Sequence, residues 1–334
     1  MQKPIDDTVL RFMTCGSVDD GKSTVIGRLL FDTKTILTDT LSQIEKTSKK
    51  KGMSDIDLSL ITDGLQAERE QGITIDVAYR YFSTGKRKYI IADAPGHEQY
   101  TRNMVTAAST AQLAIILIDA RKGILTQTKR HTYLAKLLGI KHIIVAINKM
   151  DLINYDENIY KSICTNYSEF ERNISSLNGK VNVDFIPMSA LTGDMIVDRG
   201  DSMNWFKGST LLHLLENLDT SEDIKEASLR LPIQYVCRPG ESADEELHDF
   251  RAFMGRVESG FLKVNDKIKV LPSGYESSIK EIRIGEKIIE EAIPEQSVTV
   301  SLSDEIDISR GDMLVHRNDS INATKEFTAM VCWL

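Results

Sequence analysis

Residues 8–190 alternate short apolar runs with amphipathic stretches. Five runs are dense in Val, Ile and Leu and are bounded by turn or charged residues, as strands buried on both faces of a sheet should be. They cover residues 8–16, 89–94, 113–120, 142–148 and 183–190. Between them, residues 126–139 place leucines at core spacing and end at Gly139, which predicts a helix. This alternation predicts an α/β domain with a doubly wound, mostly parallel sheet.

Two neighbouring runs predict a different local structure. Residues 73–84 and 86–94 flank Gly85 and have the pattern of a β-hairpin that turns at this glycine. Because residues 89–94 also form one of the five apolar runs, the hairpin would add one antiparallel edge strand to the parallel sheet.

From residue 229 onward the pattern changes to short strand-like runs separated by Gly, Pro and Ser. These runs cover residues 230–239, 250–260, 267–274, 277–284 and 296–303. Their even spacing predicts a small all-β barrel. Residues 323–334 begin a further apolar run, which predicts another strand.

Composition adds few constraints. Of the 334 residues, 41% are hydrophobic and 27% are charged, which is ordinary for a soluble globular protein. The net charge of −8 makes a nucleic acid an unlikely partner, although it leaves room for a local basic patch. The four cysteines, Cys15, Cys164, Cys237 and Cys332, form no CxxC pair, so neither a zinc site nor a disulfide framework is indicated.

Targeting signals are also missing from the pattern. The first residues lack the apolar region and the small-residue cleavage site of a signal peptide. No apolar run approaches the roughly 18 residues that a membrane-spanning helix needs. We therefore expect a cytoplasmic protein without a membrane partner.

The stretch GSVDDGKST follows the first predicted strand and precedes a helix. It matches the phosphate-loop pattern GxxxxGK[ST], in which glycines let backbone N–H groups approach the phosphates. Lys22 would reach the β- and γ-phosphates, and the Ser23 hydroxyl would bind Mg²⁺. The residues predicted to surround the phosphates are Gly16, Ser17, Val18, Asp19, Asp20, Gly21, Lys22, Ser23 and Thr24.

Two adjacent carboxylates, Asp19 and Asp20, are unexpected in a loop that binds a highly negative ligand. A phosphate loop binds through its backbone amides, so its variable side chains can point away from the phosphates. The residues alone suggest no chemical role for Asp20.

The stretch NKMD identifies the base. The Asp151 carboxylate can accept two hydrogen bonds from the N1–H and N2–H₂ of guanine, a donor pair that adenine lacks. Asn148 would brace neighbouring loops, and Lys149 would pack its stem along the base. After the next strand, residues 189–191 suit a backbone contact to guanine O6. The predicted base-binding residues are Asn148, Lys149, Met150, Asp151, Ser189, Ala190 and Leu191.

The stretch DAPGH completes the predicted site with Asp93, Ala94, Pro95, Gly96 and His97. Asp93 would hold Mg²⁺ through a water, and the Gly96 N–H would sense the γ-phosphate, as in nucleotide-dependent switches. Thr74 would offer its hydroxyl to Mg²⁺, and His97 would orient the attacking water. We assign catalysis to His97, Lys22 and Thr74. The metal site would comprise Ser23, Thr74 and, through a water, Asp93.

On these motifs the chain resembles the translational-type GTPases related to elongation factor Tu and elongation factor 1A. Five stretches resemble more specifically the GTPase (large) subunits of heterodimeric bacterial sulfate adenylyltransferase. They cover residues 16–24, 63–84, 86–110, 118–131 and 304–312. The resemblance implies a GTPase that uses GTP hydrolysis to drive synthesis of adenosine 5′-phosphosulfate from ATP and sulfate, with diphosphate released, on a small ATP-binding subunit.

The resemblance also implies details of the site and of the domains. Val18 and Ile73 would form an apolar gate around His97, and Asp19 would hold a monovalent cation near the β–γ bridge. Asp20 stands where the elongation factors usually carry histidine. The implied domains are a GTP-binding domain at residues 1–222 and an elongation-factor-like barrel at 223–320. Residues 321–334 would be the start of a truncated third domain, itself a barrel.

Two other functions stay open at this point. The shared architecture also fits a translation factor that delivers aminoacyl-tRNA, although the five specific stretches weigh against it. The chain could also be a guanine-nucleotide-dependent binding module with negligible turnover, against which the complete set of motifs argues.

Overall fold

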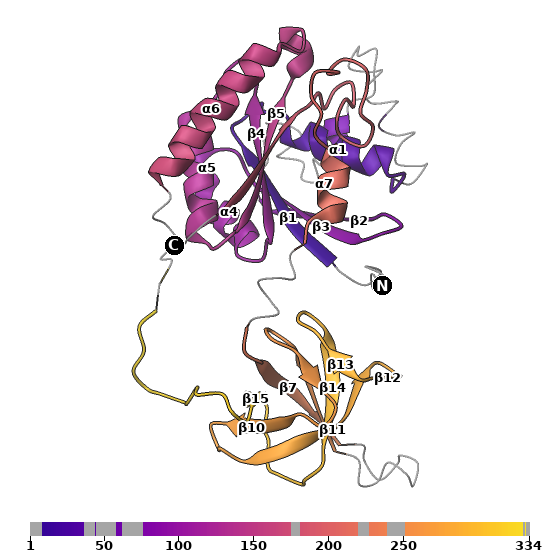
Figure 1. Ribbon diagram of the computed structural model, residues 1–334, viewed down its shortest axis with the longest axis vertical. Coiled ribbons are helices and arrows are strands. Elements are labelled where there is room, and N and C mark those ends of the chain that lie inside the picture. Colours follow the sequence, from indigo (N-terminus) through magenta and orange to yellow (C-terminus); the bar gives the residue numbers. More distant parts are fainter. Residues whose placement is uncertain are drawn as a thin grey trace. The chain divides into compact units, whose positions relative to one another are not determined.

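The computed structural model describes residues 9–36, 44, 58–61, 76–174, 181–219, 227–238, 251–329 and 331. The chain divides into two compact units, residues 1–218 and 219–334 (Figure 1). Ile73 and Thr74, to which the sequence analysis gave roles, lie outside the described residues.

The first unit is built on a six-stranded sheet of order β2-β3-β1-β4-β5-β6. Its strands are β1 (Val9–Gly16), β2 (Ala78–Ser83), β3 (Lys88–Asp93), β4 (Leu113–Asp119), β5 (His142–Asn148) and β6 (Asn182–Pro187). Strands β3, β1, β4, β5 and β6 are parallel, and β2 pairs antiparallel with β3 at the edge. The predicted parallel sheet and its antiparallel edge strand are therefore confirmed.

Helices cover both faces of this sheet. They are α1 (Lys22–Asp32), α4 (Thr101–Ala108), α5 (Thr126–Leu137), α6 (Glu157–Asn173) and α7 (Leu211–Asn217), with short 3₁₀ turns η1 (Leu58–Ile61), η2 (Glu98–Tyr100) and η3 (Met150–Ile153). Figure 1 shows α4, α5 and α6 on one side of the sheet and α1 and α7 on the other. This is the doubly wound arrangement that the alternating pattern predicts.

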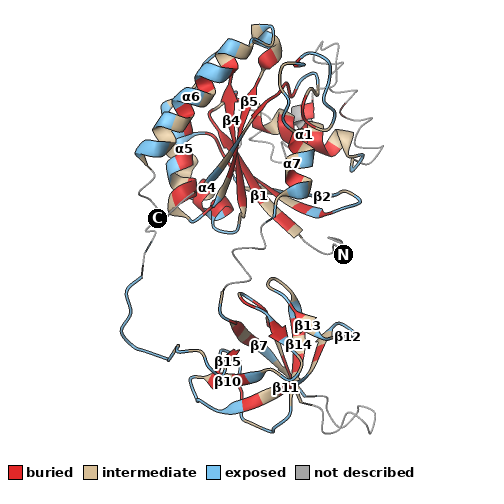
Figure 2. Ribbon diagram, viewed as in Figure 1, coloured by how far each residue is buried: buried red, intermediate tan, exposed pale blue. Residues whose placement is uncertain are grey.

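The core of the first unit lies around the central strand β4, in which every residue is buried (Figure 2). Covering a parallel strand on both faces leaves no solvated side, which explains why β4 is a continuous apolar run rather than an alternating one. Helix α6 shows the complementary pattern, since it buries Tyr160, Ile163 and Tyr167 on one face. Asp156 caps its N-terminus, and its carboxylate accepts from Asn158 N at 2.7 Å.

The second unit is a closed barrel. Its strands are β7 (Leu231–Cys237), β8 (Ala252–Arg256), β10 (Lys267–Leu271), β11 (Glu276–Ile284), β14 (Ser297–Leu302) and β15 (Met313–His316), with the short β12 (Lys287–Ile289), β9 (Leu262–Lys263) and β13 (Glu291–Ala292) beside them. The order runs β10-β15-β7-β8-β14-β11, and the pairing of β10 with β11 closes the ring. The predicted barrel is confirmed.

Two strand expectations in this unit differ from the structure. The short strands were not predicted, because runs of two to four residues do not stand out between polar neighbours; they are β9, β12, β13 and β15. In contrast, residues 323–329 form no strand, although an apolar strand was expected over 323–334. Phe327 is 80% exposed, so this apolar side chain packs on neither core.

Replacing Ile115 with Ala tests the central core. Ile115 is fully buried in β4, so the substitution leaves a cavity, and we expect a loss of about 2–5 kcal/mol in the free energy of unfolding. Urea unfolding measures this loss. Leu152→Ala is the control: Leu152 is 52% exposed, so its change should stay within about 0.5 kcal/mol. Equal effects of the two substitutions would contradict this placement of the core.

Candidate nucleotide-binding site

The predicted nucleotide motifs meet at one edge of the first sheet. The phosphate loop follows β1, the DAPGH segment begins at the last residue of β3, the NKMD segment begins at the last residue of β5, and residues 189–191 follow β6. In a doubly wound sheet, ligands bind in the crevice at the carboxyl ends of the strands. The sheet topology therefore brings together four segments that are up to 175 positions apart, as Gly16 to Leu191 are (191 − 16).

The phosphate loop turns sharply into helix α1. Gly21, just before the first helical residue, has φ of 92°, a left-handed conformation that favours glycine. The Lys22 ammonium donates to the carbonyls of Gly16 at 3.1 Å and Ser17 at 2.9 Å. The lysine side chain thus lies folded over the loop, at the position from which phosphate oxygens would replace these carbonyls as acceptors.

Lys22 is buried among carboxylates. Burial lowers the pKa of the Lys22 ammonium, and the negative charges of Asp93 and Asp20 act in the opposite direction. Asp93 is itself only 2% exposed and accepts from the Thr14 hydroxyl at 3.1 Å. A buried cation with two anionic neighbours is an arrangement that also suits a ligand with phosphate oxygens.

Gly96 packs directly against the phosphate loop. A Cβ atom at this position would lie 2.4 Å from Lys22 Nζ and 2.7 Å from the Gly16 carbonyl oxygen. A real Cβ does not approach other atoms so closely, so the segment from Asp93 to Gly96 requires a glycine at its end. Ala94 and Pro95, between these two residues, are buried.

Asn148 joins three of the four segments. Its Nδ2 donates to the Asp20 carbonyl at 2.9 Å, and its Oδ1 accepts from Ala190 N at 3.0 Å. A Cβ on Gly21 would lie 2.4 Å from Asn148 Nδ2, which shows how tightly the amide fits. The phosphate loop, β5 and the loop after β6 are therefore fixed relative to one another by one buried side chain.

The base-recognition residues lie together beside Asn148. Ser189 donates its hydroxyl proton to Asp151 Oδ1 at 2.7 Å, which orients the carboxylate. Lys149 donates to the Asp19 carbonyl and lies 3.2 Å from the Asp119 carboxylate. Met150 is buried, and its amide donates to the Met188 carbonyl at 3.2 Å. Leu191 is 63% exposed.

Two residues of this region were not predicted from the sequence. Asp119 is fully buried at the end of β4 and accepts from Arg121 Nη2 at 2.6 Å and Arg121 Nε at 3.0 Å. Burial acts to raise the pKa of Asp119, but the hydrogen bonds from Arg121 and Lys149 outweigh it and lower the pKa to about 2. Arg28, on α1, donates to the carbonyls of Ala190 and Leu191.

Asp119 could have been found from the sequence, because it ends a strand next to β5 and so must reach the same edge. The bonds from Arg121 to Asp119 were less accessible, because the Arg121 side chain reaches back to this carboxylate only in the folded turn. The contact of Arg28 with the Ala190 carbonyl was also hidden, because the two residues lie 162 positions apart. The charge network around Lys149 thus depends on tertiary structure.

The structure gives the positions of His97 and of several phosphate-loop residues, but it shows fewer contacts among the predicted catalytic residues. His97 is exposed and precedes η2, where its Nδ1 accepts from Gln99 N at 3.5 Å, and its ring lies 6.1 Å from that of Tyr100. Val18, Ser23 and Thr24 are half-buried on the phosphate loop and the first turn of α1, and Asp19 is exposed. No contact between His97 and Lys22 is among the described interactions, so the assembly of the catalytic residues stays a prediction.

The donor set fits a magnesium ion held mainly by hydroxyls and phosphates. Among the residues that the structure describes, no group of three or more His, Cys, Asp or Glu side chains could hold a metal by itself. Mg²⁺ commonly binds through one or two protein oxygens together with substrate phosphates. Ser23 on α1 and Asp93 at the end of β3 provide oxygens of this kind.

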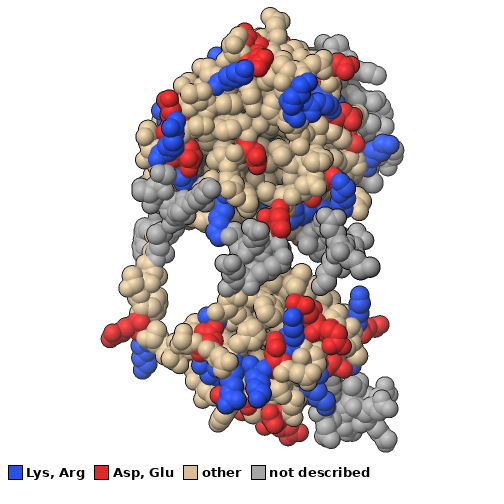
Figure 3. All heavy atoms as spheres, viewed as in Figure 1, with Lys and Arg blue, Asp and Glu red and all other residues tan. Residues whose placement is uncertain are grey.

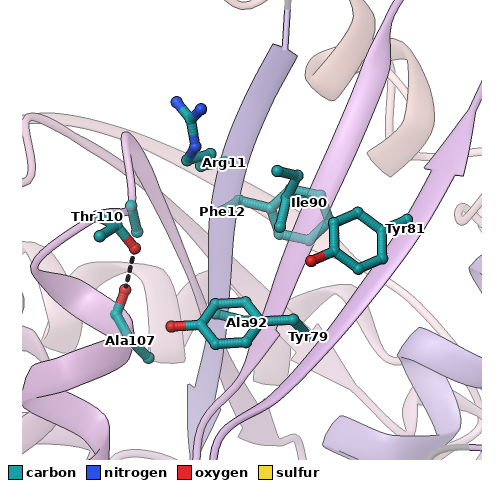
Figure 4. Close-up of a pocket in the computed structure, with 9 residues that line it drawn as sticks. Arg11, Phe12, Tyr79, Tyr81, Ile90, Ala92, Ala107 and Thr110 are labelled. Carbon is teal, nitrogen blue, oxygen red and sulfur yellow. Dashed lines mark hydrogen bonds between the residues drawn. The ribbon is translucent and has the colours of Figure 1, made fainter. Parts of the chain in front are cut away.

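A pocket of about 240 Å³ lies elsewhere on the first unit (Figure 4). Tyr79 of β2 points toward Ala107, and the ring of Tyr81 lies beside Ile90. None of the predicted nucleotide residues lines this pocket. On the face visible in Figure 3, basic and acidic side chains are intermixed. Within the described ranges, no helix is both long and apolar enough to span a bilayer.

Replacing Asp119 with Asn tests the buried charge network. The pKa of Asp119 is about 2 in the folded state and about 3.9 in an unfolded chain, so ionised Asp119 stabilises the fold above pH ~3.9. This stabilisation is lost as the pH falls through about 2. We expect Asp119→Asn to destabilise the protein at pH 7 by on the order of 1–2 kcal/mol. The difference from the unsubstituted chain should shrink below pH ~4.

Urea midpoints of both proteins at several pH values between 7 and 2.5 give this difference directly. Asp201→Asn, at an exposed position, serves as the control and should have little effect at any pH. A difference for Asp119→Asn that stays constant down to pH ~2.5 would exclude the charge network as its cause.

Comparisons with known proteins agree with this geometry. Residues 7–223 match the family model described as the elongation factor Tu GTP binding domain. The S. cerevisiae Ski7 GTPase-like domain bound to GTP is similar in fold, with a TM-score of 0.55 and 18% identity over 95% of this chain and 76% of that chain. This likeness supports the fold alone.

Curated relatives give a closer match. The chain is 53% identical over 328 residues to sulfate adenylyltransferase subunit 1 of Cellvibrio japonicus (strain Ueda107), covering 98% of this chain and 67% of that protein. It is 55% identical over 314 residues to sulfate adenylyltransferase subunit 1 of Chromobacterium violaceum, covering 93% of this chain and 64% of that protein. The chain thus spans about two thirds of the length of these relatives. It belongs to the sulfate adenylyltransferase subunit 1 family, and its first unit is an elongation factor Tu-type GTP-binding domain.

Proposed function

We propose that this chain binds and hydrolyses GTP and couples that hydrolysis to the synthesis of adenosine 5′-phosphosulfate from ATP and sulfate. The adenylyl transfer would take place on a small ATP-binding partner subunit. The observation that carries the proposal is the Asn148 side chain, which ties a phosphate loop to a loop with guanine-recognition chemistry. The family membership supports the coupling to sulfate activation.

Recognition of the nucleotide would divide between two ends of the site. Asp151, oriented by Ser189, accepts from the two donors on the guanine edge. At the other end, the N–H groups of the phosphate loop and the start of α1 point toward the β-phosphate, where the helix dipole adds positive potential. Lys22 exchanges its two carbonyl acceptors for phosphate oxygens and spreads the charge of the transition state.

The remaining residues would arrange the reaction. Ser23, Thr74 and, through a water, Asp93 would hold Mg²⁺, which when bound neutralises charge on the β- and γ-phosphates. A monovalent cation at Asp19 would neutralise negative charge near the oxygen that bridges the β- and γ-phosphates. His97 would position the attacking water, with Val18 and Ile73 as its apolar gate. The Nδ1 of His97 accepts from Gln99 N, which leaves Nε2 as the ring nitrogen available to a water.

The domain assignment is part of the same proposal. We assign residues 1–222 to the GTP-binding domain, 223–320 to the elongation-factor-like barrel and 321–334 to the start of a third domain. Docking of the partner near the switch segments would allow the nucleotide state to reach the adenylyl-transfer site.

The test is GTP turnover by this chain, alone and with the cognate small subunit, ATP and sulfate. We expect turnover to rise with the partner and adenylylsulfate to accumulate only when GTP is hydrolysed. His97→Ala is the matched variant, and it should lower kcat by about 10²–10⁴-fold while GTP affinity stays within about twofold. Turnover unaffected by the partner would favour an uncoupled binding module, and aminoacyl-tRNA binding would favour a translation factor.

Replacing Asp151 with Asn tests the base assignment separately. The amide can accept from one guanine donor but opposes the other with its own N–H₂, so we expect GTP affinity to fall by about 10²-fold or more. Xanthosine triphosphate should bind the variant better than GTP, since its C2 oxygen accepts from the new amide. Competition binding of both nucleotides to both proteins measures the switch. An Asp151→Asn variant with unchanged preference for GTP would refute the role of Asp151.

A further inference from the structure

The two adjacent carboxylates of the phosphate loop have opposite environments. Asp19 is exposed and has a left-handed backbone with φ of 67°, whereas Asp20 is only 1% exposed. The Asp20 side chain therefore does not point away into solvent, as variable side chains of such a loop can. It lies within the loop, at a place where a carboxylate is costly to bury unless it has a structural or chemical task.

One oxygen of Asp20 braces the loop. Its Oδ2 accepts from the Ser17 amide at 2.6 Å, and its own amide donates to the Ser17 carbonyl at 3.3 Å. Residues 17 and 20 are thus joined by a side-chain bond and a backbone bond. Because the Asp20 carbonyl also accepts from Asn148, a single residue links the start of the loop to the base-binding segment.

The other oxygen supplies charge without a hydrogen bond. Asp20 Oδ1 is buried and has no hydrogen-bond partner among the described residues. The negative charge of Asp20 acts to raise the pKa of Lys22, the residue that would contact the phosphates. The anion favours the cationic form of Lys22, but it also repels the phosphates of a bound nucleotide, and this repulsion opposes nucleotide binding.

We propose that Asp20 is a positioning residue that braces the phosphate loop through Ser17 and whose charge weakens nucleotide binding, so that the product GDP is released readily. This inference deepens the proposed function and rests on it. It explains why a loop for a polyanion keeps a second, buried carboxylate: the hydrogen bond shapes the loop, and the charge limits how tightly the loop holds its ligand.

Two substitutions separate these contributions. Asp20→Asn keeps an acceptor for the Ser17 amide but removes the charge, so GDP should bind about three- to tenfold more tightly and dissociate correspondingly more slowly. Asp20→Ala also removes the acceptor and leaves the Ser17 amide unpaired, so GDP should bind about tenfold more weakly to it than to Asp20→Asn. Asp201→Asn, which removes a remote exposed charge, is the control and should match the unsubstituted chain.

The measurement is stopped-flow binding and release of a fluorescent GDP by the whole chain, followed by single-turnover and steady-state GTP hydrolysis. In Asp20→Asn, the KM for GTP and the rate constant for GDP release should both fall, a combination that a purely structural role would not produce. Thermal unfolding without nucleotide verifies that each variant is folded.

The outcomes are distinct. If Asp20→Asn does not bind GDP more tightly than the unsubstituted chain, the charge of Asp20 does not weaken nucleotide binding. If Asp20→Ala binds GDP as tightly as Asp20→Asn, the hydrogen bond to Ser17 does not brace the loop. If the unsubstituted chain fails to bind GDP at all, the proposed function is wrong and this inference falls with it.

Discussion

The candidate site depends on the buried carboxamide of Asn148. It donates to the phosphate loop through the Asp20 carbonyl and accepts from the loop after β6 through Ala190 N. Each end of this amide meets a backbone group of the opposite kind, so its geometry is fixed at both ends. A nucleotide that bridges the phosphate and base segments needs them at a constant separation. This amide, together with the bond from Lys149 to the Asp19 carbonyl, sets that separation.

Around this amide, the charges of the site are balanced in pairs and triads. Lys22 is buried with Asp93 and Asp20, and Lys149 is held between the Asp19 carbonyl and the Asp119 carboxylate. Asp119 in turn is neutralised by the fork of Arg121. Buried charges are tolerated only with partners, so each of these lysines keeps its place before any ligand arrives. Lys22 and Lys149 are therefore held by groups of the protein itself, with which phosphate oxygens would compete.

The fold was largely predictable, and the reasons are physical. Strands buried on both faces, such as β4, are continuous apolar runs. In barrel strands such as β14, buried and less buried residues alternate, and turn residues flank the strand. Both patterns are visible along the chain. The pattern failed where a strand was too short, as at β15, and where an apolar residue found no core, as at Phe327. Closure of the barrel by β10 and β11 depends on pairing, which periodicity alone does not specify.

Site residues that belong to a sequence motif could be predicted, whereas residues whose role depends on contacts made only in the folded chain could not. Lys22 and Asp151 belong to motifs whose function requires those side chains at those positions, so their segments could be expected to meet at one edge of the sheet. The roles of Asp119 and Arg28 arise from contacts across the fold. Thr74 lies outside the described residues, and the exposed position of His97 leaves its catalytic role a prediction.

Asp20 illustrates why affinity alone is a poor guide to such a loop. Binding that is equally strong in the ground state and the transition state lowers KM without accelerating the chemical step. A GTPase that drives another reaction must also release GDP in every cycle, and tighter binding of the diphosphate would slow that release. In the proposed arrangement, the buried carboxylate shapes the loop through Ser17 and weakens its hold on GDP, which favours product release. The same negative charge that is out of place in a tight phosphate site is therefore consistent with a site that must turn over.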